Sequence, residues 1–195
     1  MVWISTVPPA QATGNLARAY QRQAATLGHP SQLSQLGSLD PELVAARLEL
    51  YRASERCPSA LSQRQRLVIA YLTSVLNRTP HCASQVRLKL THTGVPDQVV
   101  AALEQGSYHE LEPAEAAVAR YAHKLTTDPG AMTEADVLAL RQVGLDDLAI
   151  LDANNMCAHL NYVNRIAGGL GLHHQVGADF PAFATVPGER QAPDV

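Results

Sequence analysis

Apolar residues recur every three or four positions along most of the chain, which is the spacing of an amphipathic α-helix. No stretch shows the strict apolar–polar alternation that is typical of a β-strand. Prolines, glycines and N-capping residues divide the pattern into segments, and helices are predicted at about residues 13–27, 40–56, 62–76, 79–93, 96–105, 113–126, 133–143 and 146–168. The pattern therefore predicts an all-α fold, a single-domain helical bundle of about eight helices.

Proline also marks the two ends of the predicted domain. Pro8 and Pro9 stop any helix, so residues 1–11 are expected to form an extended arm. Such an arm packs on its own domain or reaches across to a partner subunit. The helical domain is expected to cover residues 12–174, and the proline-containing residues 175–195 are expected to form a loose tail.

Several of the predicted helices carry an apolar face that should be buried. The helix over residues 62–76 is apolar on nearly every side from Leu67 onward, and Ser62 and Gln65 have the spacing of a capping box at its start. We expect this helix in the centre of the bundle or in a subunit interface, with Leu67 as a core residue. The other positions expected to face inward are Leu16, Ala17, Tyr20, Ala24, Leu43, Ala46, Leu50, Ala53, Leu138, Leu140, Leu148, Leu151, Met156, Leu160, Val163 and Ile166.

Cys82 is the first candidate for chemistry. Thr79 is a suitable N-cap whose hydroxyl can accept a hydrogen bond, and Pro80 suits the first helical position, where its missing N–H is not needed. This register places Cys82 in the first turn, where free amides and the positive end of the helix dipole favour a thiolate. A reactive thiol and a buried, inert cysteine both remain open.

His81 is the second candidate. It precedes Cys82 but points about 100° away around a helix. A protonated imidazole at this position would lower the pKa of the thiol, whereas a histidine in a first turn is otherwise a solvated side chain.

A set of short segments, in this order and spacing, carries a resemblance to a known family. They are residues 1–7, 12–17, Leu61-Ser62, 77–87 and the sequence Asn-Tyr-Val-Asn-Arg-Ile at 161–166. Together they make the chain, over roughly residues 1–174, similar to the carboxymuconolactone decarboxylase and alkylhydroperoxidase D-like family, and to its peroxidase-related branch. The resemblance implies a helical fold and a thiol-dependent, antioxidant oxidoreductase. The decarboxylase activity of the wider family has no separate support in the sequence.

The sequence departs from this family's catalytic pattern at three of four positions. The pattern places a glutamate on one helix, Cys-x-x-Cys at the start of the next and a histidine one turn later. Cys82 stands at the second cysteine, while Thr79, Val86 and Leu67 stand at the first cysteine, the histidine and the glutamate. Without a partner thiol at residue 79, the local disulfide of the family's cycle cannot form, and the relay for the thiol proton is missing.

Composition excludes several other classes of protein. The 195 residues carry a net charge of -3 without a basic stripe, and only 5% are aromatic, so nucleic acid is not an expected partner. The three cysteines are too few for a disulfide scaffold and favour a cytoplasmic location. We expect no signal peptide at the N-terminus and no membrane span, because no run of about 18 apolar residues occurs.

The remaining polar residues indicate no cofactor and no metal. The histidines do not have the spacing of zinc ligands. His173 and His174 would make a weak metal site, because adjacent residues on a helix do not face each other. Polar side chains crowd the last helix and either face solvent, pair with one another or line a pocket near Cys82: Asn154, Asn155, His159, Asn161 and Asn164. Nothing in the sequence directly supports a disulfide between Cys82 and Cys157.

Two functions of different classes follow. The first is a peroxidase-like oxidoreductase in which Cys82 cycles through a sulfenic acid, reduces a peroxide or other small molecule and needs an external thiol reductant. The substitutions at residues 67, 79 and 86 indicate weak or absent activity. The alternative is a non-catalytic binding module that kept the family fold. In both cases the apolar helix over 62–76 and the N-terminal arm favour a homo-oligomer, a dimer or higher.

Overall fold

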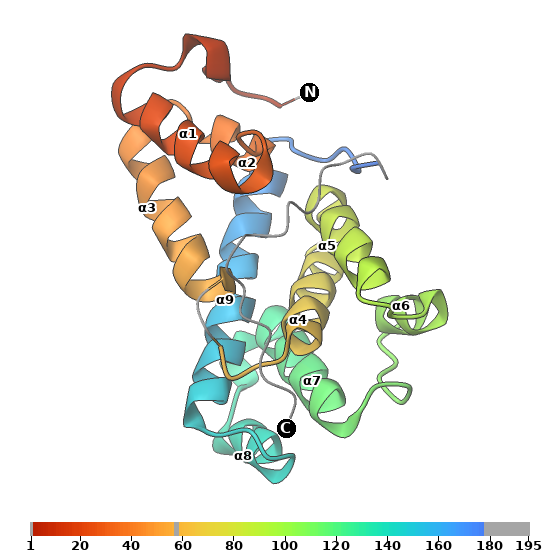
Figure 1. Ribbon diagram of the computed structural model, residues 1–195. Coiled ribbons are helices and arrows are strands. Elements are labelled where there is room, and N and C mark those ends of the chain that lie inside the picture. Colours follow the sequence, from red (N-terminus) through yellow and green to blue (C-terminus); the bar gives the residue numbers. More distant parts are fainter. Residues whose placement is uncertain (1, 57–58, 178–195) are drawn as a thin grey trace.

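Helices account for all the regular structure in the computed structural model, which describes residues 2–56 and 59–177 (Figure 1). Within these residues the α-helices are α1 (Gly14–Leu27), α2 (Gln32–Leu36), α3 (Pro41–Tyr51), α4 (Gln63–Leu76), α5 (Pro80–His92), α6 (Asp97–Glu104), α7 (Pro113–Thr127), α8 (Glu134–Gln142) and α9 (Asp147–Gly169). Short 3-10 turns lie at Pro9–Gln11 and Pro129–Ala131, and a π-helical turn, η2, lies at Arg52–Arg56. The predicted all-α fold is confirmed, with one short helix more than expected.

The additional helix is α2, in a stretch that the sequence presents only as a polar turn. Ser31 caps it, because its hydroxyl accepts a hydrogen bond of 3.1 Å from the amide of Ser34. Leu36 at its end is 1% exposed and packs with Cys82 in a small apolar cluster. A helix of little more than one turn is too short for its periodicity to be visible in the sequence.

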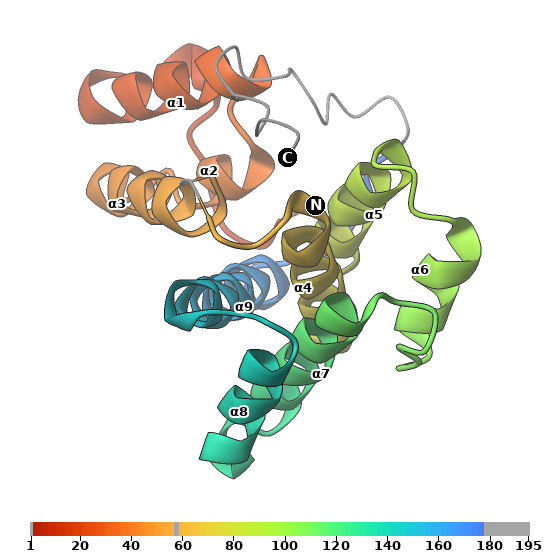
Figure 2. The same cartoon turned by 60° about the horizontal axis from the view of Figure 1, so that its bottom comes forward.

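Helix α4 is the centre of the bundle, as predicted. Its residues 67–74 are all buried, and it packs against α5, α7 and α9 (Figure 2). The predicted capping box is present, since Ser62 and Gln65 exchange hydrogen bonds of 3.1 and 2.9 Å. Each fully buried Val, Leu or Ile side chain in this helix contributes about 1.5–3 kcal/mol to folding. Because α4 is covered within the monomer, its apolar surface no longer argues for a homo-oligomer.

The predicted apolar face of α3 is wrong, and that of α9 is confirmed only in part. On α3, Leu43 and Leu50 are 44% and 48% exposed, and the helix instead packs on α1 through Val44 and the half-buried Leu48. On α9, Leu148 and Leu151 are 56% and 53% exposed. The predicted Met156, Leu160 and Val163 are buried, and Ala149 and Ala153 are buried in place of the two leucines. On α8, Leu140 is buried as expected, whereas Leu138 is exposed.

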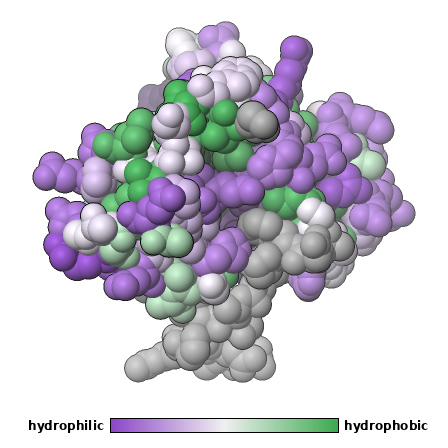
Figure 3. Space-filling view, turned by 90° about the horizontal axis from the view of Figure 1, so that it is seen from above, coloured by the Kyte–Doolittle hydropathy of each residue, from purple (hydrophilic) through white to green (hydrophobic). Residues whose placement is uncertain are grey.

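The N-terminal arm packs on its own domain, which was one of its two predicted alternatives. The amide of Trp3 donates to the carbonyl of Leu170, and the indole packs against Gly171, whose φ of +85° and lack of a Cβ make room for the ring. Further along the arm, the hydroxyl of Tyr20 donates to the carbonyl of Val7. Seen from above, this end of the molecule shows hydrophobic patches among hydrophilic side chains (Figure 3).

Most of the predicted C-terminal tail, residues 178–195, lies outside the described residues. Within the part of the chain that the structure describes, no helix is both long and apolar enough to cross a membrane.

Candidate functional site

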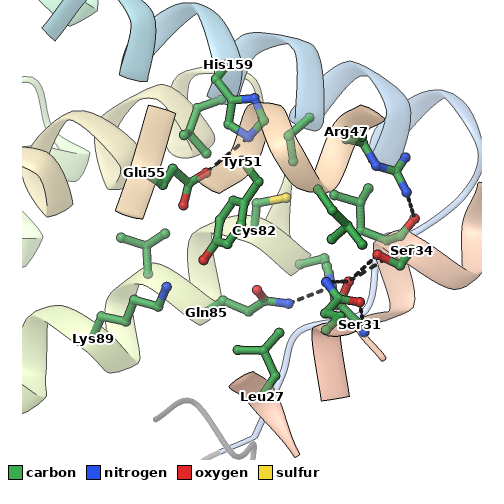
Figure 4. Close-up of a pocket in the computed structure, with 17 residues that line it drawn as sticks. Leu27, Ser31, Ser34, Arg47, Tyr51, Glu55, Cys82, Gln85, Lys89 and His159 are labelled. Carbon is green, nitrogen blue, oxygen red and sulfur yellow. Dashed lines mark hydrogen bonds and ion pairs between the residues drawn. The ribbon is translucent and has the colours of Figure 1, made fainter. Parts of the chain in front are cut away.

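A cavity of about 120 Å³ lies between the α1–α3 layer and helices α5 and α9. Much of its wall consists of leucine and valine side chains. Its chemistry comes from polar and ionisable side chains on four different elements (Figure 4), namely Tyr51, Glu55, Cys82, Gln85, Lys89 and His159. The cavity therefore brings Cys82 together with an acid and a base that lie far from it in the sequence.

Cys82 has the predicted position but not the predicted acidity. Pro80 is at the first helical position, so Cys82 lies in the first turn of α5. The thiol is buried among apolar side chains, and this burial, together with the negative charge of Glu55, raises its pKa to about 12. A helix terminus can lower a pKa by less than about one unit, so desolvation is the larger effect. The predicted thiolate is therefore wrong.

Thr79 also differs from its predicted role. Its side chain makes no capping hydrogen bond to α5, and its hydroxyl donates instead to the carbonyl of Asn77 over 3.4 Å. Residue Arg78 between them has a φ of +53°, which turns the chain sharply between α4 and α5. Pro80, rather than a threonine cap, is the local signal that begins this helix.

Glu55 and His159 form the acid–base pair of the cavity. Glu55 comes from the π-helical turn η2 after α3, and His159 comes from the middle of α9. Oε1 of Glu55 lies 3.3 Å from Nε2 of His159, whose side chain is only 2% exposed. Neither ring nitrogen of His159 is aligned for a hydrogen bond with the protein. A buried imidazole with both nitrogens unsatisfied is uncommon, and it leaves hydrogen-bonding capacity for a bound molecule.

Two aromatic rings lie close to the imidazole of His159. The ring of Tyr51 lies 6.2 Å from it and the ring of Tyr162 lies 6.5 Å from it, centroid to centroid. Both contacts lie within the usual range for aromatic pairs. The imidazole is therefore held in place by packing, with both nitrogens buried and Oε1 of Glu55 near Nε2.

His81 is buried rather than solvated. Burial lowers its pKa to about 4, so the imidazole is neutral near pH 7 and supplies no positive charge to the thiol of Cys82. Its Nδ1 lies 3.2 Å from the carbonyl of His174, and its Nε2 lies 2.8 Å from Nε2 of Gln85. His81 therefore joins the C-terminal segment to a side chain that lines the cavity.

The three substituted family positions are apolar or unreactive in this structure. Leu67 is buried in the main core, as predicted, and does not line the cavity. Val86 does line it, and Thr79 is 2% exposed. The correspondence of these residues with the family's glutamate, histidine and first cysteine stays a prediction of the sequence alignment.

Cys157 belongs to a different environment from Cys82. It is fully buried, with its sulfur 3.4 Å from the hydroxyl of Thr126 and 3.6 Å from that of Thr73. Both cysteines are free thiols. Cys57 lies outside the described residues.

Several amides of α9 are paired within the protein, one of the predicted alternatives. The side chain of Asn161 bonds with Asn77, and that of Asn154 accepts a hydrogen bond from Tyr121. Among the described residues, no group of three or more His, Cys, Asp or Glu side chains is placed to hold a metal ion.

Solved structures show which fold this is. The structure aligns with an uncharacterized peroxidase-related protein from Ralstonia eutropha JMP134, described as an alkylhydroperoxidase AhpD core, with a TM-score of 0.79 over 90% of this chain and 92% of that chain at 18% identity. The chain has the alkylhydroperoxidase D-like fold. A peroxidase-related protein from Silicibacter sp. TM1040 gives a TM-score of 0.76 over 87% and 89% of the two chains at 21% identity.

The debrominase Bmp8, in complex with 2,3,4-tribromopyrrole, shares this alkylhydroperoxidase D-like fold. It aligns with a TM-score of 0.70 over 85% of this chain and 88% of that chain at 17% identity. No protein-family model and no curated protein matches the sequence. At these identities the likeness establishes the fold, while chemistry has to be argued from the site.

Sequence reasoning missed the Glu55–His159 pair. His159 stood out as a polar residue on an apolar helix, but nothing near Glu55 distinguished it from a surface glutamate. The two meet only because η2 packs against α9. Their partnership is a property of the tertiary structure and has no local signal.

Proposed function

We propose that this protein is a slow, thiol-dependent oxidoreductase in which Cys82 reduces a small hydroperoxide, assisted by Glu55 and His159. One observation carries the proposal: the thiol and the Glu55–His159 pair line the same cavity. The fold is that of peroxidase-related proteins, which agrees with this choice of chemistry. The pair would take the part of the family's glutamate and histidine, whose aligned positions hold Leu67 and Val86.

The proposed reaction balances as follows. The sulfur of Cys82 attacks the outer oxygen of the hydroperoxide, the O–O bond breaks, and the sulfur is oxidised by two electrons to a sulfenic acid. His159 takes the thiol proton and returns a proton to the leaving alkoxide, which departs as an alcohol. Two molecules of an external thiol then restore Cys82 and leave as a disulfide, with release of water.

The pKa of Cys82 determines the rate of peroxide reduction that we expect. With a pKa of about 12, roughly one thiol in 10⁵ is ionised at pH 7. The resting enzyme therefore holds a thiol, and proton removal by His159 has to accompany the attack. This predicts turnover far below that of a site with two cysteines and an acidic thiol.

A non-catalytic binding module is the second candidate. The raised pKa of Cys82 favours it, because a protonated, buried thiol behaves as a small apolar side chain. The complex of debrominase Bmp8 with tribromopyrrole is a case of small-molecule binding on this fold.

Consumption of tert-butyl hydroperoxide in the presence of dithiothreitol separates the two candidates. We expect slow, protein-dependent consumption that is lost in Cys82→Ser and retained in the matched control Cys157→Ser, which alters the thiol outside the cavity. Absence of any consumption above the dithiothreitol background would leave the binding module as the function. Consumption that survives Cys82→Ser would show that the reactive site lies elsewhere.

A further inference from the structure

Gln85 presents an oriented hydrogen-bond acceptor to the cavity. The carbonyl of His174 can only accept, so Nδ1 of His81, 3.2 Å away, carries the ring proton. Nε2 of His81 is then an acceptor, and the Gln85 amide nitrogen, 2.8 Å away, donates to it. This fixes which end of the Gln85 side chain faces His81. The carbonyl oxygen of Gln85 points toward Tyr51 and Cys82, inside the cavity (Figure 4).

Charged side chains of both signs line the cavity, so the Gln85 acceptor, rather than the net charge of the wall, limits the kind of ligand that suits this position. Glu55 brings a carboxylate to the same cavity. The guanidinium of Arg47 donates to the carbonyl of Leu33, in the first turn of α2, over 2.6 Å. Lys89 is the other cation of the wall, and Figure 4 shows it on the same side of the cavity as Gln85, one turn further along α5. A carbonyl oxygen cannot donate to a carboxylate ligand, so this acceptor suits a neutral molecule that donates a hydrogen bond.

The size and lining of the cavity limit the rest of the ligand. The volume of about 120 Å³ is close to that of an apolar cavity of about 150 Å³ that is known to hold benzene. Leu48, Val86, Leu160 and Val163 supply apolar walls, and Tyr51 adds an aromatic face. A single small ring matches this space.

We propose that the cavity binds neutral, one-ring molecules that carry an O–H or N–H donor, such as a phenol or an azole, and that Gln85 determines this specificity. The inference goes beyond the proposed function, because a phenol or an azole has no O–O bond to reduce, and it names molecules that the same cavity binds. It rests on Gln85 and His81, whereas the redox proposal rests on Glu55 and His159.

Binding of phenol, anisole and benzoate to the full-length protein at pH 7, followed by NMR titration, tests this proposal. Phenol donates a hydrogen bond, anisole has the ring without a donor, and benzoate has the ring with a negative charge. We expect phenol to bind about tenfold more tightly than anisole, which corresponds to one net hydrogen bond. Benzoate should bind more weakly than phenol.

Gln85→Met keeps the length of the side chain but removes the amide, and should bring phenol and anisole to within twofold of each other. Gln21→Met, at an exposed position of α1, is the matched control and should keep the tenfold preference. Equal binding of phenol and anisole to the wild type, tighter binding of benzoate, or no saturable binding of phenol would each overturn the proposal. If Gln85→Met does not fold, the wild-type comparison alone decides. Because none of these titrations involves a redox step, their failure is distinct from a failure of peroxide consumption.

Discussion

Oε1 of Glu55 lies 3.3 Å from Nε2 of His159, although the two residues belong to elements at opposite ends of the domain sequence. The imidazole is almost completely buried, and the rings of Tyr51 and Tyr162 pack near it. A carboxylate close to an imidazole is a common arrangement in sites that move a proton. Here the pair shares a cavity with a thiol that burial keeps protonated.

Alkylation of Cys82 should be slow and should keep accelerating at high pH. Because the pKa of the thiol is raised to about 12, the rate with iodoacetamide should rise through pH 9 without a plateau. Glu55→Gln removes a negative charge that raises this pKa, so it should increase the rate at pH 9. Mass spectrometry of the Cys82 peptide measures both rates. A plateau near pH 8.5 would contradict the buried thiol.

The neutral, buried state of His81 should make the protein less stable in acid. Its pKa is lowered to about 4 in the folded state, below the 6.5 of an ordinary histidine, so the unfolded state binds a proton that the folded state does not. Stability should therefore fall as the pH drops from about 6.5 toward 4, by about 2–3 kcal/mol from this group. Urea unfolding at pH 7 and pH 4.5 should show a smaller loss in His81→Gln than in the wild type. An equal loss in both would show that His81 is not the group responsible.

A glutamate at residue 67, the position aligned with the family's glutamate, should destabilise the protein without speeding peroxide reduction. Leu67 lies in the main core and outside the cavity, so a carboxylate at this position would be buried away from Cys82. Leu67→Glu should lower the free energy of unfolding by about 3 kcal/mol or more, whereas the similarly sized Leu67→Met should lower it by less than about 1.5 kcal/mol. Thermal unfolding measures both. If Leu67→Glu is as stable as Leu67→Met and speeds peroxide reduction, the aligned position is part of the site after all.

The homo-oligomer remains a prediction, but a different surface is now expected to form its interface. Of the two features that first suggested it, α4 is covered within the monomer, whereas the N-terminal arm lies on its own domain and leaves Trp3 68% exposed. Leu39, Leu43 and Leu50 instead form an exposed apolar stripe at helical spacing at the start of α3 and along it. We expect a dimer or higher oligomer that dissociates in Leu43→Lys/Leu50→Lys, while Leu138→Lys on α8 leaves it intact. Light scattering at micromolar concentration measures this, and a monomeric wild type would refute it.

Local chemistry made much of the fold predictable. Asp40-Pro41, the Ser62–Gln65 capping box and Pro80 all begin helices where the sequence places them. The inward faces were less predictable, since α3 has one apolar stripe through Leu43 and Leu50 and another through Val44 and Leu48. Only the position of α1 decides which stripe is buried.

The candidate site was predictable only in part. The position of Cys82 in a first turn follows from Pro80, which is its neighbour in sequence. Its pKa depends on burial by Leu36 and Val163, which come from distant elements. The partners Glu55 and His159 likewise meet only in the folded chain, so no local rule could pair them.

The rate at which tert-butyl hydroperoxide oxidises Cys82 at pH 7 tests the central claim most directly. The sulfenic acid can be trapped with dimedone and quantified on the Cys82 peptide by mass spectrometry. We predict measurable oxidation in the wild type and a rate at least about tenfold lower in His159→Phe, which keeps the aromatic packing but removes the base. His109→Phe, at an exposed site, should match the wild type. Oxidation at the wild-type rate in His159→Phe, or no oxidation of Cys82 in the wild type, would contradict the account.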